Sequence, residues 1–228
     1  MCGIAGVVEA EGPATRELLD RMGAAIAHRG PDEGRSVLLG RAGFAFRRLA
    51  IIDVAGGSQP IENETGRITG MCNGEIYNYL DLRRELEARG HRFRTQSDVE
   101  TVVHGYEEWG DDVASHLHGM FVFAVWDADR ERLLLGRDRL GKKPLVYAET
   151  SGRLIYGSEF AAVLADLVAV AEALIAGLEH AGRGLARDRG VRRRARLAAR
   201  RAVVRVGLGV DLAAVRVGLV AVREAGVA

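Results

Sequence analysis

The sequence predicts a layered α+β fold, in which many strands pack with a few interposed helices. Three observations lead to this prediction. Short apolar runs bounded by Gly or turn residues recur between residues 4 and 157, as strands require. Segments with one apolar face at helical spacing separate some of these runs. The chain has 228 residues, 48% of them hydrophobic and 28% charged, so it can bury a sizeable core.

The first predicted elements are a strand and a helix. Residues 4–8 form a short apolar run next to Gly residues, which predicts a strand. Thr15 is a suitable N-cap for a helix that Gly30-Pro31 ends. The apolar face of this helix is formed by Leu18, Leu19, Met22 and Ile26.

Two strands and a turn are predicted next. Residues 44–52 and 68–72 are apolar runs typical of strands. Asn73-Gly74 follows the second run directly, and this dipeptide favours a turn. We therefore expect a turn between the second strand and the element that follows.

Two helices are predicted after this turn. Asn78 is a suitable N-cap for the first, in which Leu82 and Leu86 face inward and which Gly90 ends. The second opens with the capping-box pattern Ser97-Asp98-Val99-Glu100.

The remaining elements are strands joined by tight turns, followed by a helix that begins at Glu159. Turn signals lie at residues 127–130 and 150–152. The strands are predicted over residues 120–126, 133–136, 145–148 and 154–157.

Composition excludes several classes of protein. The formal net charge of +1 does not favour nucleic acid as a partner. Two cysteines cannot form a disulfide scaffold or a zinc cluster, and no metal site is predicted. The N-terminus lacks the features of a signal peptide, and no stretch of 18 uncharged apolar residues occurs. We therefore expect a cytoplasmic globular protein that spans no membrane.

Residues 168–228 differ in composition from the rest of the chain. Ala, Arg, Val, Gly and Leu account for 54 of these 61 residues, and the segment carries a charge of +7. Two interpretations stay open: a basic helical tail, or the product of a shifted reading frame, because all five residues have GC-rich codons. We predict one domain over residues 1–166 and a helical or disordered tail of no recognised domain over residues 167–228.

Cys2 is a candidate nucleophile. Removal of Met1, which is favoured before a small second residue, would give Cys2 a free α-amine that titrates near neutral pH. One residue would then hold both a soft nucleophile and a base, which is the logic of N-terminal nucleophiles. Taken alone, a chance cysteine near the start explains the position better.

Asn73 and Gly74 are candidates for stabilising an oxyanion. A tetrahedral intermediate at an amide carbon needs hydrogen-bond donors aimed at its oxygen. The Asn73 side chain and the Gly74 N–H can supply two, and glycine permits the close approach. From these two residues alone, an ordinary Asn-Gly turn is the simpler interpretation.

Arg48 and Asp98 are candidates for binding the charged ends of a ligand. Arg48, beside an apolar run, can hold a carboxylate through two parallel hydrogen bonds, although surface ion pairs of this kind are common. Asp98 can accept a ligand ammonium, or it can complement the dipole of the helix that follows. Taken separately, both residues favour the structural interpretation.

Taken together, a series of motifs in one order resembles the glutaminase domain of asparagine synthetases over residues 1–166. The series begins with Met1-Cys2-Gly3-Ile4-Ala5-Gly6 and His28-Arg29-Gly30-Pro31-Asp32. It continues with Arg48-Leu49-Ala50-Ile51-Ile52-Asp53, Asn73-Gly74-Glu75-Ile76-Tyr77-Asn78, Ser97-Asp98, Gly119-Met120-Phe121, Arg137-Asp138-Arg139-Leu140-Gly141 and Ser158-Glu159. Seven or more motifs in one order make the resemblance highly specific.

The resemblance implies a four-layer αββα N-terminal nucleophile (Ntn) hydrolase fold. It also implies that L-glutamine is hydrolysed to glutamate and ammonia through a cysteinyl thioester. By motif, Cys2 is the nucleophile and its amine the base, while Asn73 and Gly74 form the oxyanion hole. Arg48 binds the α-carboxylate of glutamine and Asp98 its α-ammonium. The pocket is lined by Glu75 and by the backbone of Leu49, Ala50, Ile51 and Ile52.

This chain departs from the family at two positions, and a third position, Cys72, has two interpretations. The family often has His where this chain has Phe46, and usually Gly where it has Gln96. Gln96 would restrict the loop that carries Asp98 if a positive φ were needed there. Cys72 is expected to be a small core residue, with an oxidised pair to Cys2 as the alternative.

The resemblance stops short of the family's second domain, which binds ATP through a pyrophosphate loop rich in Ser and Gly. No such loop occurs in the 228 residues, so we expect the synthetase domain to be absent from them. The glutaminase reaction is expected to need no cofactor, since ATP and Mg belong to that second domain. A synthetase domain or subunit is a candidate partner.

Two other functions stay open. One is an amidotransferase of an exopolysaccharide or exosortase cluster with another ammonia acceptor, which residues 89–94 and 106–110 resemble. The other is a remnant that binds a synthetase without turning over glutamine.

Overall fold

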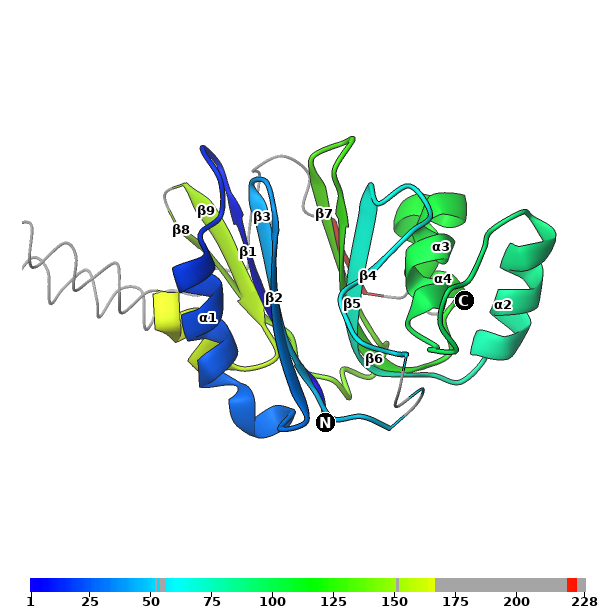
Figure 1. Ribbon diagram of the computed structural model, residues 1–228, viewed down its shortest axis with the longest axis horizontal. Coiled ribbons are helices and arrows are strands. Elements are labelled where there is room, and N and C mark those ends of the chain that lie inside the picture. The colour runs from blue at the N-terminus through cyan, green and yellow to red at the C-terminus, as the bar shows by residue number, and fades with distance from the viewer. Residues whose placement is uncertain (52, 54–55, 151, 167–220, 225–228) are drawn as a thin grey trace, which may run out of the picture. The chain divides into compact units, whose positions relative to one another are not determined.

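Two five-stranded sheets carry helices on their outer faces (Figure 1). The computed structural model describes residues 1–51, 53, 56–150, 152–166 and 221–224. The helices are α1 (Arg16–Ala25), α2 (Tyr79–Ala88), α3 (Glu100–Trp109) and α4 (Val113–His116), with 3-10 turns η1 (Ala27–Arg29) and η2 (Gly110–Asp112). The strands are β1 (Gly3–Glu9), β2 (Glu33–Leu39), β3 (Ala42–Arg48), β4 (Ile61–Glu62), β5 (Ile68–Ile76), β6 (Gly119–Asp127), β7 (Arg132–Arg137), β8 (Val146–Thr150), β9 (Arg153–Gly157) and β10 (Ala221–Glu224).

The first sheet has the strand order β2-β3-β1-β9-β8, with every neighbouring pair antiparallel. β1 lies at its centre, where Gly3 pairs with Arg47 of β3 and Ala5 pairs with Gly157 of β9. Burial on both faces explains why this strand reads as a continuous apolar run. The residue before β1, Cys2, is therefore held at the end of the most enclosed strand of this sheet.

The second sheet has the order β10-β7-β6-β5-β4. β5 and β6 pair along their whole length, from Ile68 opposite Asp127 to Ile76 opposite Gly119. All of its pairs are antiparallel except β10 with β7, which is parallel. β5 has nine residues and leads into the loop that precedes α2.

Two apolar layers hold the sheets and helices together. One layer lies between the sheets and joins residues such as Ile4 and Phe44 of the first sheet to Met71 and Val122 of the second. The other lies between the second sheet and the helices α2, α3 and α4. On the outer face of the first sheet, Leu19 of α1 approaches Gly43 of β3. The resulting order of layers, α, β, β, α, is the one implied by the Ntn-hydrolase resemblance.

Several local predictions differ from the structure. The strand expected over residues 44–52 ends at Arg48, and the strand expected to end at Cys72 continues to Ile76. β2 and β4 were not predicted, because β2 is only partly buried and β4 has two residues. The helix expected from Glu159 is present over residues 160–166.

The tail expected over residues 167–228 lies outside the described residues except for Ala221–Glu224, which form a strand rather than a helix. By compactness the chain divides into Met1–Val163 with Val215–Ala228 as one unit and Leu164–Ala214 as another. No helix in the described part of the chain is long and apolar enough to cross a membrane.

Candidate active site

Cys2 stands at the entrance of β1 with its thiol against the backbone of Leu49. The Leu49 N–H donates to Cys2 Sγ at 3.4 Å, and the thiol faces the Leu49 carbonyl at 3.5 Å. The Cys2 carbonyl accepts a hydrogen bond from Arg29 Nε at 3.0 Å. Two residues further on, Ile4 exchanges hydrogen bonds with Ser158, whose Oγ accepts from Ile4 N at 3.0 Å. Residues far apart in sequence therefore fix both sides of the thiol-bearing residue.

The loop that carries Leu49 is itself held by the segment after α1. Asp32 Oδ2 accepts the Ala50 N–H at 2.9 Å, and Arg29 is anchored by an ion pair to Glu159 at 2.7 Å. A Cβ on Gly30 would lie 2.4 Å from the backbone of Arg47 and Arg48, so only glycine permits this approach. The sequence suggested no role for these residues, because each acts through a contact that no local pattern reveals.

Asn73 and Gly74 lie inside β5 rather than in a turn, opposite Val122 and Phe121 of β6. The predicted turn was therefore wrong. Gly74 uses its conformational freedom within the strand: its φ is 154°, and a Cβ there would lie 2.0 Å from the Met120 carbonyl oxygen. Glycine at such a point permits close approach of two backbones.

The Asn73 side chain is 1% exposed, and neither its Oδ1 nor its Nδ2 has a hydrogen-bond partner among the described residues. Side chains alternate along a strand. Met71 belongs to the layer between the sheets and Cys72 to the helix side, so Asn73 projects between the sheets, where Cys2 also packs. A buried amide with unused donors is suited to an oxyanion.

Arg48 ends β3 with its side chain almost fully buried. Its Nη2 donates to the Asp53 carbonyl at 2.6 Å, and its Nη1 lies 3.6 Å from Glu33 Oε2. Asp53 has a φ of 47°, and its carboxylate accepts N–H groups from Gly56 at 2.9 Å and Gln96 at 2.8 Å. Asp53 therefore joins the loop after Arg48 to the segment that leads into Asp98.

Asp98 is buried, and its Oδ2 accepts the Ile76 N–H at 2.8 Å. Burial is the largest influence on the pKa of Asp98 and raises it, and the negative charge of Glu75 raises it further. Backbone N–H groups of Ile76, Asp98 and Val99 oppose this rise in pKa. Two neighbouring carboxylates, one of them poorly solvated, favour a cation between them.

Cys72 directly precedes Asn73 on β5, and charged groups nearby influence the pKa of its thiol. Burial raises the pKa of the Cys72 thiol well above its ordinary value, and the charges of Asp98 and Cys2 raise it further, while Lys143 lowers it. Cys72 and Cys2 are both free thiols, so the alternative of an oxidised pair is not present. Cys72 is a core residue on the helix side of β5, as predicted.

The other predicted pocket residues are less enclosed. Leu49 and Ala50 are half-buried and are held by backbone hydrogen bonds, whereas the Ile51 side chain is 63% exposed. Ile52 lies outside the described residues. Phe46, where the family often has His, belongs to the layer between the sheets. Gln96 is not among the described non-glycine residues with positive φ, so the expected backbone restriction does not arise.

This chain is similar in sequence to known proteins. A family profile described as "Glutamine amidotransferase domain" matches residues 1–181. Asparagine synthetase [glutamine-hydrolyzing] 2 of Bacillus subtilis is 45% identical over 163 residues, covering 70% of this chain and 22% of that protein. Asparagine synthetase B of Escherichia coli is 36% identical over 167 residues, covering 72% and 30%. The chain thus spans between a fifth and a third of the length of these relatives.

Solved structures are similar in fold at low sequence identity. Glutamine phosphoribosylpyrophosphate amidotransferase from B. subtilis superposes with a TM-score of 0.55 at 19% identity, over 71% of this chain and 42% of that one. A structure titled as the allosteric regulatory enzyme of purine biosynthesis gives 0.58 at 20% identity, over 72% and 43%. The αββα architecture is therefore shared with these enzymes. Because the family profile covers most of the chain, this protein belongs to the glutamine amidotransferase domain family.

Proposed function

We propose that Cys2 of this chain hydrolyses L-glutamine to glutamate and ammonia. The observation that supports this most is the pairing of a fixed thiol with an unused amide. The Cys2 thiol contacts the backbone of Leu49, in the loop after β3 of the first sheet. The buried Asn73 side chain projects from the second sheet without a partner among the described residues. A nucleophile and an oxyanion donor are the two parts that amide hydrolysis needs.

The first step forms a covalent intermediate. Excision of Met1 converts the Cys2 nitrogen into an amine, which takes the thiol proton as Sγ attacks the side-chain amide carbon of glutamine. The new C–S bond places negative charge on the amide oxygen, and the Asn73 amide and the Gly74 N–H donate to it. When the C–N bond breaks, the proton on the amine passes to the leaving nitrogen and ammonia departs. A thioester on Cys2 remains.

The second step releases glutamate. Water attacks the thioester carbon while the Cys2 amine accepts one of its protons. The same oxyanion donors stabilise the second tetrahedral intermediate. The C–S bond then breaks and the amine returns its proton to the sulfur. The new carboxyl group loses the second proton of the water to solvent, and glutamate leaves.

Charged groups at the other end of the site position the substrate. Arg48, oriented by Asp53 and Glu33, suits the α-carboxylate of glutamine. Asp98 and Glu75 suit its α-ammonium, because the cation relieves the repulsion between them. These contacts are remote from the reacting amide, so they fix its orientation relative to Cys2.

We also propose that this activity serves an asparagine-synthetase-like protein, in which ammonia goes to an activated aspartate. The similarity to asparagine synthetases supports this. ATP and Mg would act in the synthetase part of such a protein, and the glutaminase reaction would need neither.

The test compares both cysteines in the purified chain. Ammonia release from glutamine is measured for the wild type, Cys2→Ala and Cys72→Ala, and intact mass determines whether Met1 is present. We expect mature protein without Met1, no ammonia from Cys2→Ala, and most of the activity in Cys72→Ala, because Cys72 lies on the helix side of β5. Full activity in protein that retains Met1, or in Cys2→Ala, would contradict the mechanism.

A further inference from the structure

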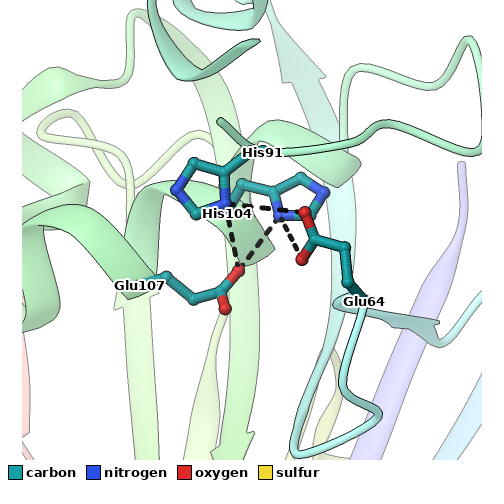
Figure 2. Close-up of side chains that lie close together, drawn as sticks. All are labelled: Glu64, His91, His104 and Glu107. Carbon is teal, nitrogen blue, oxygen red and sulfur yellow. Dashed lines mark hydrogen bonds and ion pairs between the residues drawn. The ribbon is translucent and has the colours of Figure 1, made fainter. Parts of the chain in front are cut away.

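Four side chains with no part in the glutamine chemistry converge on the helix-covered side of the second sheet (Figure 2). His104 and Glu107 lie one turn apart on α3, His91 follows α2, and Glu64 comes from the turn between β4 and β5. One ligand atom from each of the four lies within 4.8 Å of all the others. Three separate segments therefore present two imidazoles and two carboxylates to one point.

The spacing of these atoms suits a tetrahedral metal ion. His104 Nδ1 lies 3.0 Å from Glu107 Oε2 and 3.6 Å from Glu64 Oε2. His91 Nδ1 lies 3.5 Å from Glu107 Oε2 and 3.8 Å from Glu64 Oε1. Ligands at the usual Zn–N and Zn–O distances of a tetrahedral site are about 3.4 Å apart. These four separations surround this value, and the remaining pairs of ligand atoms lie within 4.8 Å of each other, so side-chain movements would close the site around an ion.

Both imidazoles are oriented for coordination through Nδ1. His91 Nε2 lies 3.0 Å from Glu108 Oε1, and a carboxylate behind the outer ring nitrogen is the arrangement that holds metal-bound histidines in the correct tautomer. His104 Nε2 lies 3.6 Å from Glu100 Oε1 and has no hydrogen-bond partner among the described residues. Its Nδ1 is instead oriented by Glu107 Oε2 at 3.0 Å, so both Nδ1 atoms face the common point.

The two inner carboxylates are also oriented from outside. Asn63 Nδ2 donates to Glu107 Oε1 at 2.6 Å, and the Arg92 N–H donates to Glu64 Oε1 at 2.6 Å. These bonds direct Glu107 Oε2 toward both imidazoles and Glu64 Oε2 toward His104. The His104 side chain is fully buried whereas that of Glu64 is 30% exposed, so an ion can enter from the Glu64 side.

From this geometry we propose that Glu64, His91, His104 and Glu107 bind one divalent transition-metal ion, for which Zn²⁺ is the natural probe. Two nitrogen and two oxygen ligands suit Zn²⁺, and the two carboxylate charges neutralise it. The ion would clamp the segment after α2 and the β4–β5 turn onto α3. That segment continues through Arg94 and Thr95, whose N–H groups bond to Glu100, into Asp98.

The alternative to a metal ion at this cluster is that its imidazoles bind protons only. Burial lowers the pKa of His104, but the carboxylates of Glu100, Glu107 and Glu64 outweigh it and raise this pKa to about 9. A metal must displace the protons on the imidazole nitrogens that it binds. A cluster of histidine–carboxylate ion pairs without any metal is therefore the outcome that would overturn the proposal.

The test is a titration of the full, chelator-treated chain with Zn²⁺ at pH 8, followed by calorimetry and thermal unfolding. We expect one ion per chain and a rise in Tm of about 5–10 °C at a hundredfold excess over Kd. Co²⁺ should give tetrahedral ligand-field bands without a thiolate charge-transfer band, because no cysteine belongs to the site. Absence of stoichiometric binding by the wild type would overturn the proposal.

Variants decide where the ion binds. Glu64→Gln changes the most exposed ligand, so its fold should persist, and we expect its Zn²⁺ affinity to fall by about 10–100-fold or more. His91→Gln should act in the same direction. His118→Gln, at an exposed histidine outside the cluster, and Cys2→Ala are the controls and should bind as the wild type does. Binding that survives Glu64→Gln and His91→Gln but disappears in Cys2→Ala would place the ion at the thiol and refute the site.

Discussion

Asn73 is a buried polar residue whose hydrogen-bonding capacity is unused by the described part of the protein. Leaving such a group unsatisfied costs about 1–3 kcal/mol. We therefore predict that Asn73→Ala leaves the free energy of unfolding unchanged or raises it. Turnover of glutamine should fall by roughly 10²–10³ if the amide is an oxyanion donor. Urea unfolding and ammonia release measure the two effects.

Asn78→Ala is the matched control for Asn73. The Asn78 amide is fully engaged, because it donates to the His116 carbonyl and accepts from the His118 N–H, both at 2.9 Å. Its removal should lower stability and leave turnover intact. If Asn73→Ala behaved in this way instead, its assignment to the oxyanion hole would be wrong.

Asp98 predicts a pH dependence of substrate binding. Because burial raises the pKa of this carboxyl and Glu75 adds to the rise, Asp98 becomes neutral at a higher pH than an ordinary aspartate. A neutral Asp98 does not attract the α-ammonium, so the KM for glutamine should increase as the pH falls through this raised pKa. This KM is obtained from initial rates measured at a series of acidic pH values. Asp81→Asn, at an exposed position, should keep this profile, whereas Asp98→Asn should have a high KM at every pH.

The raised pKa of Asp98 also determines how this carboxyl changes the stability of the protein with pH. A carboxyl with a raised pKa in the folded state binds its proton more tightly there than in the unfolded chain. Its contribution to stability is fully present below the unfolded pKa and is lost as the pH rises through the folded pKa. Asp98→Asn should therefore increase Tm at neutral pH, and an unchanged or lower Tm would argue against a destabilising charge there.

At this scale the sequence named candidate chemistry-bearing residues but not the residues that position them. Cys2, Arg48, Asn73 and Asp98 were named from their chemistry and motifs. The role of Asp53, which links the Arg48 loop to Gln96, depends on a contact across 43 residues. No local periodicity encodes a contact of that kind.

Among the elements, β5 departs most from its sequence pattern. An Asn-Gly pair is a strong turn signal because glycine adopts positive φ. In β5 that freedom is used within the strand, where the Met120 carbonyl approaches Gly74. As a result the oxyanion candidates lie on a rigid strand rather than on a loop.

Gly74→Ala should show how tightly this strand is fitted. A Cβ 2.0 Å from a backbone oxygen cannot be accommodated by a side-chain rotation, so β5 and β6 must separate. We expect a loss of about 3 kcal/mol or more in the free energy of unfolding, measured by urea titration. Gly90→Ala is the control, because its φ is +105° but no atom lies within 4 Å. It should cost only about 1–2 kcal/mol of backbone strain, and equal losses in both variants would refute the steric argument.

The helix signals placed the N-caps of α1 and α2 correctly, whereas the capping box opened the next helix at Ser97 and the structure has the N-cap of α3 at Val99. Asn78 and Thr15 occupy N-cap positions without a side-chain capping bond. Glu100, the last residue of the expected capping box, is buried and accepts the N–H groups of Arg94 and Thr95 instead. A local pattern therefore located the starts of α1 and α2, while tertiary contacts decided how the polar side chains are used.

For the molecule as a whole, strand positions were predictable but strand order was not. Short apolar runs located β1, β6, β7, β8 and β9. The placement of β1 between β3 and β9 joins segments separated by most of the chain, and only the family resemblance implied such layers. The metal cluster was likewise not predicted, because Glu64 and Glu107 meet only when α3 packs on the second sheet.

Removal of residues 167–228 tests whether the site is self-contained. Every hydrogen bond and ion pair described above for Cys2, Arg48, Asp53 and Asp98 is made within residues 1–166. We expect kcat and KM for glutamine to be unchanged, and Tm to fall slightly because β7 loses its pairing with β10. Loss of turnover in a truncated protein whose circular dichroism is native would reveal a catalytic role for the removed segment.

The central position of β1 also sets the order of events during synthesis. Ile4 cannot reach Ser158, 154 residues away, until the ribosome has made nearly all of the described fold. At about 5–20 residues per second this takes roughly 8–30 s, during which the N-terminus has no completed sheet to enter. An aminopeptidase can therefore remove Met1 from a nascent chain before Lys143 Nζ meets its thioether sulfur at 2.9 Å. The nucleophile would thus be chemically mature before its own pocket exists.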